Sequence, residues 1–295
     1  GYLGYGNKTF AMSHGIRYKT NKYLLGSLET SGEYRPNFLD YQTYISYKPN
    51  SRWEAEVIGY ISENHYNFTP ETRETTFGTF ADAKTFFVYF DGQEKDVFRT
   101  YFGTASITRS FSDSTKIKFL TSAFHTKEKE TYDIMGQYWL DDSQSSENLG
   151  VGTYMEHARN YLTADVVSFK LVGTHRTRHH DFEAGITYKT ERIKETSREY
   201  EMRDSSGYSI PHQPDRLDLI YTLSAKNDVK SHRIEAYVQD IYHFTKGDNF
   251  FSLNYGLRLA NWSFNKETIV SPRASIAIVP AFNHDLTFRF ATGLL

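Results

Sequence analysis

Residues 53–62 read WEAEVIGYIS, and their side chains follow the two-residue period of a β-strand. One alternate set is apolar apart from a single glycine and consists of Trp53, Ala55, Val57, Gly59 and Ile61. The other set begins with two carboxylates, Glu54 and Glu56. The stretch therefore predicts a strand with one apolar face, and that face contacts either a protein core or lipid.

The composition favours contact with lipid. Aromatic residues make up 16% of the 295 residues, with 23 Tyr and 22 Phe, yet the mean hydropathy is -0.60. Tyr, Phe and Thr are strand formers. A transmembrane β-barrel stays polar on average because only alternate residues of each strand face lipid.

Several classes of protein and site are excluded. The absence of cysteine excludes disulfides, thiol catalysis and cysteine metal sites. The net charge of -2 gives no indication of a nucleic-acid partner. No apolar run of about 18 residues occurs, so no spanning helix is expected. The chain begins without a secretion signal and stops within an alternating run, so we expect it to be part of a longer protein.

Further alternating runs occur in pairs, and a short polar turn joins the two runs of each pair. The paired runs are 40–47 with 53–62, 100–110 with 115–124, 161–173 with 181–189, 232–244 with 250–260, and 271–280 with 286–295. Long polar segments connect the pairs over residues 63–97, 126–160 and roughly 195–231. Short turns at one end and long loops at the other are typical of outer-membrane barrels, whereas soluble sandwiches mix loop lengths.

We therefore predict an all-β fold, an antiparallel transmembrane β-barrel with long extracellular loops. Residues 216–226 also alternate, and we interpret them as a hairpin arm within one of these loops. The count is then about 11 spanning strands, whereas bacterial single-chain barrels have even numbers. Residues 1–295 are thus predicted to form one partial β-barrel domain, with further strands elsewhere.

Longer segments carry a family resemblance. They include SHGIRYKTNKYLLGSLETSGEYRP (13–36), ETYDIMGQYWLDD (130–142), GVGTYMEHARNYLTADV (150–166) and FNKETIVSPRASIA (264–277). Together they resemble the barrel region of TonB-dependent outer-membrane receptors, in the subgroup with a carboxypeptidase-regulatory-like domain ahead of the plug. The resemblance covers most of the chain.

The resemblance implies a 22-strand barrel, of which this chain is about half, in the outer membrane of a Gram-negative bacterium. It implies active import of a bulky, scarce nutrient such as a siderophore, glycan or peptide. The expected partners are outer-membrane lipid, the remaining barrel strands, a surface lipoprotein lid, and the TonB complex. The TonB complex would act through a plug. The plug, the TonB box, the signal peptide and the closing strands are not recognised in these residues.

Two other functions stay open: a passive porin-like channel and a soluble all-β carbohydrate-binding module. An enzyme is not expected, because no nucleophile–base pairing or phosphate loop is recognisable. No cofactor is expected either. The segment HRTRHHD (175–181) has metal-ligand residue types, but adjacent His179 and His180 would point to opposite faces of a strand. No metal site is therefore predicted.

Two groups of candidate functional residues follow. Aromatic and acidic side chains suit the binding of a sugar, peptide or siderophore, and the predicted substrate-facing loop offers Tyr132, Asp133, Met135, Tyr138 and Trp139. The alternative is that these rings pack the loop against its neighbours. The predicted lumen-facing polar residues are Glu54, Glu56, Arg258, Arg273 and Arg289. Their alternative role is to hydrogen-bond a plug or one another.

Overall fold

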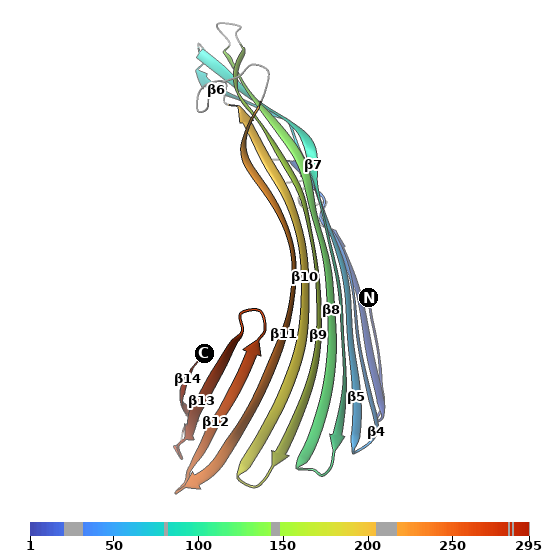
Figure 1. Ribbon diagram of the computed structural model, residues 1–295, viewed down its shortest axis with the longest axis vertical. Coiled ribbons are helices and arrows are strands. Elements are labelled where there is room, and N and C mark those ends of the chain that lie inside the picture. The colour runs from blue at the N-terminus through green and yellow to red at the C-terminus, as the bar shows by residue number, and fades with distance from the viewer. Residues whose placement is uncertain are drawn as a thin grey trace.

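A computed structural model describes residues 1–20, 32–79, 82–142, 148–204, 217–282, 284 and 286–294. Within these residues the regular structure is entirely β, and 14 strands form one antiparallel sheet (Figure 1). No helix long and apolar enough to cross a membrane occurs in the described part of the chain. The predicted all-β, antiparallel class is confirmed.

The sheet is an up-and-down meander, because almost every strand pairs with the strands that precede and follow it. Along the sheet the order is β1-β2-β4-β5-β7-β8-β9-β10-β11-β12-β13-β14, while β3 pairs with β5 and β6 pairs with β7. The strands are β1 (Tyr2–Gly6), β2 (Phe10–Thr20), β3 (Gly32–Tyr34), β4 (Asn37–Asn50), β5 (Trp53–Pro70), β6 (Arg73–Thr79), β7 (Asp82–Ser110), β8 (Thr115–Asp142), β9 (Asn148–Arg176), β10 (His180–Asp204), β11 (Asp218–Lys246), β12 (Asn249–Trp262), β13 (Glu267–Val279) and β14 (Phe288–Gly293).

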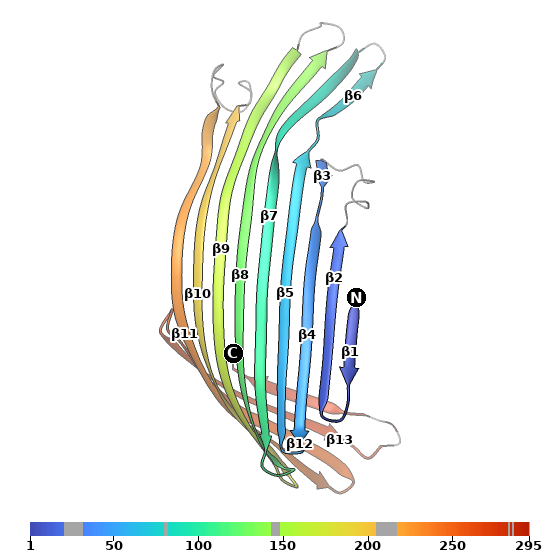
Figure 2. The same ribbon diagram turned by 90° about the vertical axis from the view of Figure 1, so that its right-hand side faces the viewer.

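The sheet is curled but not closed. In Figure 2 the strands β12 and β13 pass behind the lower ends of the other strands. Among the described residues, β1 and β14 each pair on one side only. The path along the sheet has 12 strands, one more than the predicted count of about 11. The size of the closed barrel, and the share of it that this chain supplies, stay predictions.

The prediction of long extracellular loops is wrong. The polar segments 63–97, 126–160 and 195–231 are largely strand, and β7 to β11 are 25 to 29 residues long. At about 3.4 Å per residue the longest of these strands extends about 100 Å, roughly three times the hydrocarbon thickness of a bilayer. The described part of 216–226 is likewise the first part of β11, and it continues directly into the membrane-level part of that strand.

The sequence pattern changes where the strands leave the membrane level, whereas the hydrogen-bonded pairing of the strands continues. Lys127 and Lys129 of β8 share one face of the sheet, and Glu128 and Glu130 share the other. Water wets both faces there, so neither face needs apolar residues. Charge alternation replaces the apolar–polar alternation, and a search for apolar faces reads such a segment as a loop.

Directly paired residues of neighbouring strands point to the same face of a sheet, so the register defines an outer and an inner face. The row through Val57 on the outer face is mostly apolar and comprises Ile45, Val57, Ala105, Thr121, Phe169, Tyr188 and Ile234. The row through Glu54 on the inner face connects it to Thr108, Lys118, Val172, Gly185, Tyr237 and Arg258.

The apolar residues of the outer face do not form a protein core. Among the described residues, the only buried apolar ones are Pro70, Gly136 and Ala158. Large side chains such as Phe169, Ile186 and Val238 are exposed instead, at 44%, 50% and 54% of their surface. A continuous exposed apolar surface of this extent on a β-sheet is the surface that lipid covers. We call it the apolar belt.

Aromatic side chains mark both edges of the apolar belt. At the short-turn edge the guanidinium carbon of Arg109 lies 4.9 Å from the ring centroids of both Trp53 and Phe111. At the opposite edge three Tyr–His ring pairs follow the sheet: Tyr41 with His14, Tyr101 with His125 and Tyr188 with His232. Tyr and Trp favour membrane interfaces because the ring is apolar and its polar group stays wet.

The belt has the height of a membrane. From Trp53 to Ile61 the strand is about 27 Å long, and at a tilt of about 40° it spans about 21 Å of height, close to the apolar band of about 25 Å in outer-membrane barrels. Short turns connect five pairs of consecutive strands at the edge of the belt near Trp53, which is the lower end in Figure 2. The long ends of β7 to β11 project from the opposite edge. This is the layout of bacterial outer-membrane proteins, whose short turns face the periplasm. The chain is therefore located in the outer membrane of a Gram-negative bacterium.

Adjacent residues with equal exposure test the two faces. Val57 on the outer face and Ile58 on the inner face are both 44% exposed. We expect Val57→Arg to lower the free energy of unfolding by about 2–4 kcal/mol, because it places a charge in lipid near the bilayer midplane. Ile58→Arg places the same charge in the wet lumen and should cost much less. Urea titrations of the protein in lipid vesicles measure both, and equal costs would contradict the assignment of faces.

Hydrogen exchange tests the extension of the strands beyond the membrane. Residues 127–137 of β8 are paired on both sides, with β7 and with β9. Their backbone amides should therefore exchange much more slowly than those of the turn at residues 111–114. Exchange over 127–137 as fast as in that turn would restore the loop interpretation.

Candidate functional site

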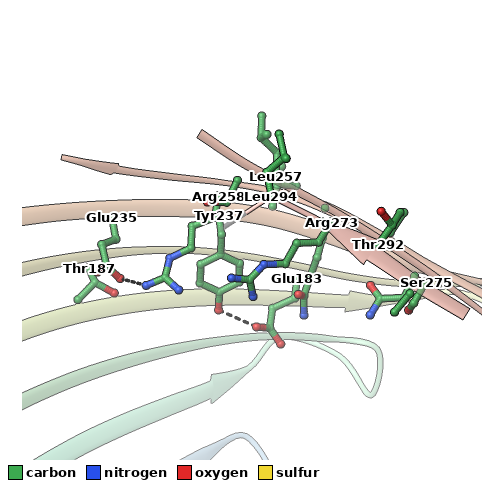
Figure 3. A pocket seen from close by; sticks show the side chains of 18 of the residues that line it. Glu183, Thr187, Glu235, Tyr237, Leu257, Arg258, Arg273, Ser275, Thr292 and Leu294 are labelled. Atoms are coloured by element: carbon green, nitrogen blue, oxygen red, sulfur yellow. Dashed lines mark hydrogen bonds and ion pairs between the residues drawn. The ribbon is translucent and has the colours of Figure 1, made fainter. Parts of the chain in front are cut away.

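The inner face is hollowed where the strands from β9 to β13 curl toward β14 (Figure 3). The hollow has a volume of about 720 Å³. Residues of six neighbouring strands, β9 to β14, line it. Its charged and aromatic lining residues are Lys170, Glu183, Glu235, Tyr237, Arg258 and Arg273.

Contacts between strands orient these groups. Arg258 Nη2 donates to Glu235 Oε2 at 2.5 Å, and the Tyr237 hydroxyl donates to Glu183 Oε1 at 2.6 Å (Figure 3). Lys170 Nζ lies 5.5 Å from the centroid of the Tyr237 ring, within cation–π distance. Basic and acidic side chains therefore both line the hollow. Such a surface can bind a ligand that carries several hydroxyl, carboxylate or amine groups.

The register places all the predicted lumen-facing residues on the inner face, but it brings only two of them together. Arg258 and Arg273 both line the hollow. Glu56 lies on the same face but on β5, several strands away from the hollow, and it accepts hydrogen bonds from Lys118, Tyr44 and Ser106 at 2.8, 3.0 and 3.1 Å. Glu54 forms an ion pair with Lys48, and Arg289 lies on β14 opposite Ala277. A role in substrate passage stays a prediction for each of the five.

The structure corrects the prediction of a loop here: residues 130–142 lie in the strand β8. Side chains of a strand alternate between faces, so the five candidates cannot gather at one site. Tyr132 and Tyr138 lie on the inner face, and Asp133, Met135 and Trp139 lie on the outer face. Charged strands that continue into water give no apolar stripe, and this is why the sequence pattern did not distinguish the two sets.

The structure groups Tyr138 with rings that sequence reasoning missed. Its ring centroid lies 5.9 Å from that of Phe86, 6.4 Å from that of Phe90 and 5.9 Å from that of Tyr154. The Tyr154 ring lies directly over Gly136, where an added Cβ would come within 2.5 Å of it. We call Phe86, Phe90, Tyr138 and Tyr154 the ring cluster. It can stack against the faces of sugar rings or other flat groups.

An acidic patch lies on the inner face between the ring cluster and the membrane. Its carboxylates come from three strands and are Glu94, Asp96, Glu130 and Glu199. Asn160 bridges two of them, donating from Nδ2 to Glu130 at 3.1 Å and to Glu199 at 2.6 Å. Sequence reasoning missed the patch because its members meet only across the sheet. The available signal was the regular alternation of Glu with Lys along β8.

Burial and crowding raise the pKa values of this patch. Loss of water contact, together with the neighbouring Asp96 and Glu130, raises the pKa of Glu94 to about 7. Burial and the Glu130 charge also raise the pKa of Asp96, which is only 7% exposed. Burial and nearby carboxylates raise the pKa of Tyr132 to about 12, so its hydroxyl stays protonated. The patch can therefore carry a proton on Glu94 at neutral pH.

Asp133 has a separate set of contacts on the outer face. It accepts hydrogen bonds from His157 Nδ1 at 2.5 Å and from Arg159. Burial opposes its ionisation, but these two hydrogen bonds outweigh burial and lower the pKa of Asp133. The His157 ring in turn stacks on Tyr200, with the ring centroids 4.5 Å apart. These contacts stabilise the extracellular ladder, and they point away from the inner face.

The segment HRTRHHD has its own hydrogen-bond partners. His180 Nδ1 and the Tyr255 hydroxyl both lie 2.7 Å from Asp240 Oδ2, and they cover this outer-face carboxylate so that it is 3% exposed. Arg176 Nε donates to Asp181 at 2.6 Å. Within the described ranges, no group of three or more His, Asp or Glu side chains is arranged to hold a metal ion.

Comparisons with known proteins give a distant likeness to solved β-barrel structures. No protein-family model and no curated protein sequence matches the chain. The translocator domain of the autotransporter NalP from Neisseria meningitidis is 10% identical with a TM-score of 0.38, over 97% of this chain and 82% of that one.

The beta domain of the Bordetella autotransporter BrkA is 11% identical with a TM-score of 0.32, over 97% of this chain and 91% of that one. The ferric-catecholate import receptor Fiu from E. coli K12 is 8% identical with a TM-score of 0.19, over 98% of this chain and 66% of that one. No function follows from likeness at this level. Membership of the TonB-dependent receptors stays a prediction.

Lowering the pH from about 8 to about 6 should protect the extracellular ends of β7 and β8 against hydrogen exchange. The folded-state pKa of Glu94, about 7, lies above its value of about 4.3 in an unfolded chain. The folded state therefore binds more protons between these values, and stability falls as pH rises through 7.

Glu94→Gln should remove most of this pH dependence. The exposed carboxylate of Glu74 on β6 provides a control, since Glu74→Gln should leave the dependence intact. The measurement is the protection factor, which corrects for the intrinsic effect of pH on exchange. Protection that increases toward high pH would contradict the acidic patch as described.

Proposed function

We propose that the chain is part of the wall of a TonB-dependent importer for a bulky, scarce nutrient. One observation carries the proposal: the inner face continues as a chemically varied surface far above the membrane. It begins with the ring cluster, continues through the acidic patch and reaches the hollow at membrane level. A passive pore needs a wet lumen only across the bilayer, whereas this surface can contact a ligand well before the membrane.

The order of these surfaces suggests a path for the ligand. The rings of Tyr138 and Tyr154 would stack against it first. The carboxylates of the acidic patch would then hydrogen-bond its hydroxyl or amine groups. Arg258 and Arg273 would meet it in the hollow at the level of the membrane. A siderophore, a glycan or a peptide has the size and the mixture of groups that this path fits.

The proposal includes partners that complete the barrel. Unpaired backbone groups at the free edges of β1 and β14 would cost several kcal/mol each in lipid, so further strands are needed to pair with them. A plug inside the barrel would contact inner-face residues such as Glu56 and Arg258 and would receive energy from the TonB complex. A surface lipoprotein could cover the extracellular strand ends.

Conductance separates active import from passive flow. The complete protein, purified from outer membranes in detergent, should give no steady conductance in a planar bilayer because a plug fills the lumen. A steady, ohmic conductance of the same preparation would support the porin-like alternative and contradict import. Crosslinking then tests the plug itself.

A photoreactive phenylalanine derivative at position 58 should crosslink to another part of the protein, and the same group at position 57 should crosslink to lipid.

A further inference from the structure

Lysines gather on the outer face directly above the apolar belt. They are exposed, they come from β8, β10 and β11, and they form no ion pair within the described residues. We call this set the basic collar, and it consists of Lys127, Lys129, Lys194, Lys226 and Lys230. Lys127 and Lys129 lie two and four residues above His125, which marks the upper edge of the belt on β8. On β10 and β11 the Tyr188–His232 pair marks this edge. Lys230 lies two residues above His232, and Lys226 and Lys194 lie six residues above His232 and Tyr188.

The acids on this part of the outer face form their ion pairs with other bases: Glu63 with Arg99 at 2.9 Å, Asp165 with His125 at 2.7 Å and Asp228 with Arg192 at 3.1 Å. Asp228 also lies opposite Lys194 in the ladder and interacts electrostatically with Lys194 and Lys230, so it offsets part of the charge of the collar. The unpaired carboxylates at the same height, including those of the acidic patch, lie on the inner face. A single layer of sheet therefore separates a cationic outer surface from an anionic inner one.

The spacing of the collar suits a phosphate group. Lys127 and Lys194 lie in one row with Thr163 between them. Strands are about 4.8 Å apart, so the two lysine backbones are about 10 Å apart. Two flexible ammonium groups can close on an anion in that gap, and the Thr163 hydroxyl can donate to it. Lys129 lies two residues further along β8 and about 7 Å away.

The height of the collar identifies the ligand. Lipid acyl chains cover the apolar belt, so the outer-face residues just above it lie at the level of the lipid headgroups. A soluble anion could bind at any height, whereas a headgroup is confined to this level. We propose that the basic collar binds the phosphate groups of the phosphorylated glycolipid in the outer leaflet. This inference rests on the membrane position of the sheet and does not depend on import.

Native mass spectrometry of the complete protein in detergent tests the proposal. The probes are bis-phosphorylated lipid A and the same lipid with both phosphates removed. We expect the wild-type protein to prefer the phosphorylated form. Lys127→Gln with Lys194→Gln should weaken its binding about 25-fold, or about fivefold for each lysine, and leave the dephosphorylated form unaffected. Added salt should weaken the phosphate-dependent part.

Two further variants make the result specific. Lys8→Gln with Lys246→Gln removes the same charge at the opposite end of the sheet and should leave lipid binding unchanged. Lys127→Arg with Lys194→Arg keeps the charge and should retain the preference. The proposal is overturned if both forms of the lipid bind equally to the wild-type protein. It is equally overturned if the variant at Lys8 and Lys246 loses as much affinity as the collar variant.

Discussion

The backbone hydrogen-bond ladder between antiparallel neighbours is the constraint on which this structure depends. The sheet has a single layer, and Pro70, Gly136 and Ala158 are the only buried apolar residues among those described. No second layer packs against it, so tertiary packing cannot hold the strands. In lipid every backbone N–H and C=O must find a partner inside the protein. The ladder supplies those partners through the membrane, and it then continues to the far ends of β7–β11 with local irregularities at Tyr138/Trp139, at Glu201/Met202 and between Thr196 and Glu199.

Because the ladder fixes the backbone, the environment of each face decides which side chains are suitable there. Lipid requires Val57 and Phe169 on the outer face, and the aqueous lumen permits Glu56 and Arg258 on the inner face. Above the membrane both faces are wet, and charge takes over as the difference between them. Lysines then gather outside and carboxylates inside. The alternation of side chains between faces therefore separates apolar from polar residues within the membrane and basic from acidic residues above it.

This change in the residue types that alternate along a strand explains what the sequence could and could not predict. Residues 53–62 predicted the strand correctly, and the register places its apolar and its acidic set on opposite faces of the sheet, because an apolar stripe is visible within one segment. The extension of β8 was missed because Lys127 to Glu130 look like a polar loop when only apolar residues are counted. The ring cluster and the acidic patch were missed for another reason. Their members, such as Phe86 and Tyr154, come from strands far apart in sequence and meet only through the register.

The single-layer wall has a consequence for how such a protein can diversify. In a globular domain a new side chain at a ligand site usually disturbs a packed core. Here, residues such as Glu130 or Tyr138 have a lumen on one side and only the backbone ladder on the other. Substitutions on the inner face can therefore accumulate with little penalty to the lipid-facing framework. Ligand preference and membrane stability can evolve as separate traits of the same strands.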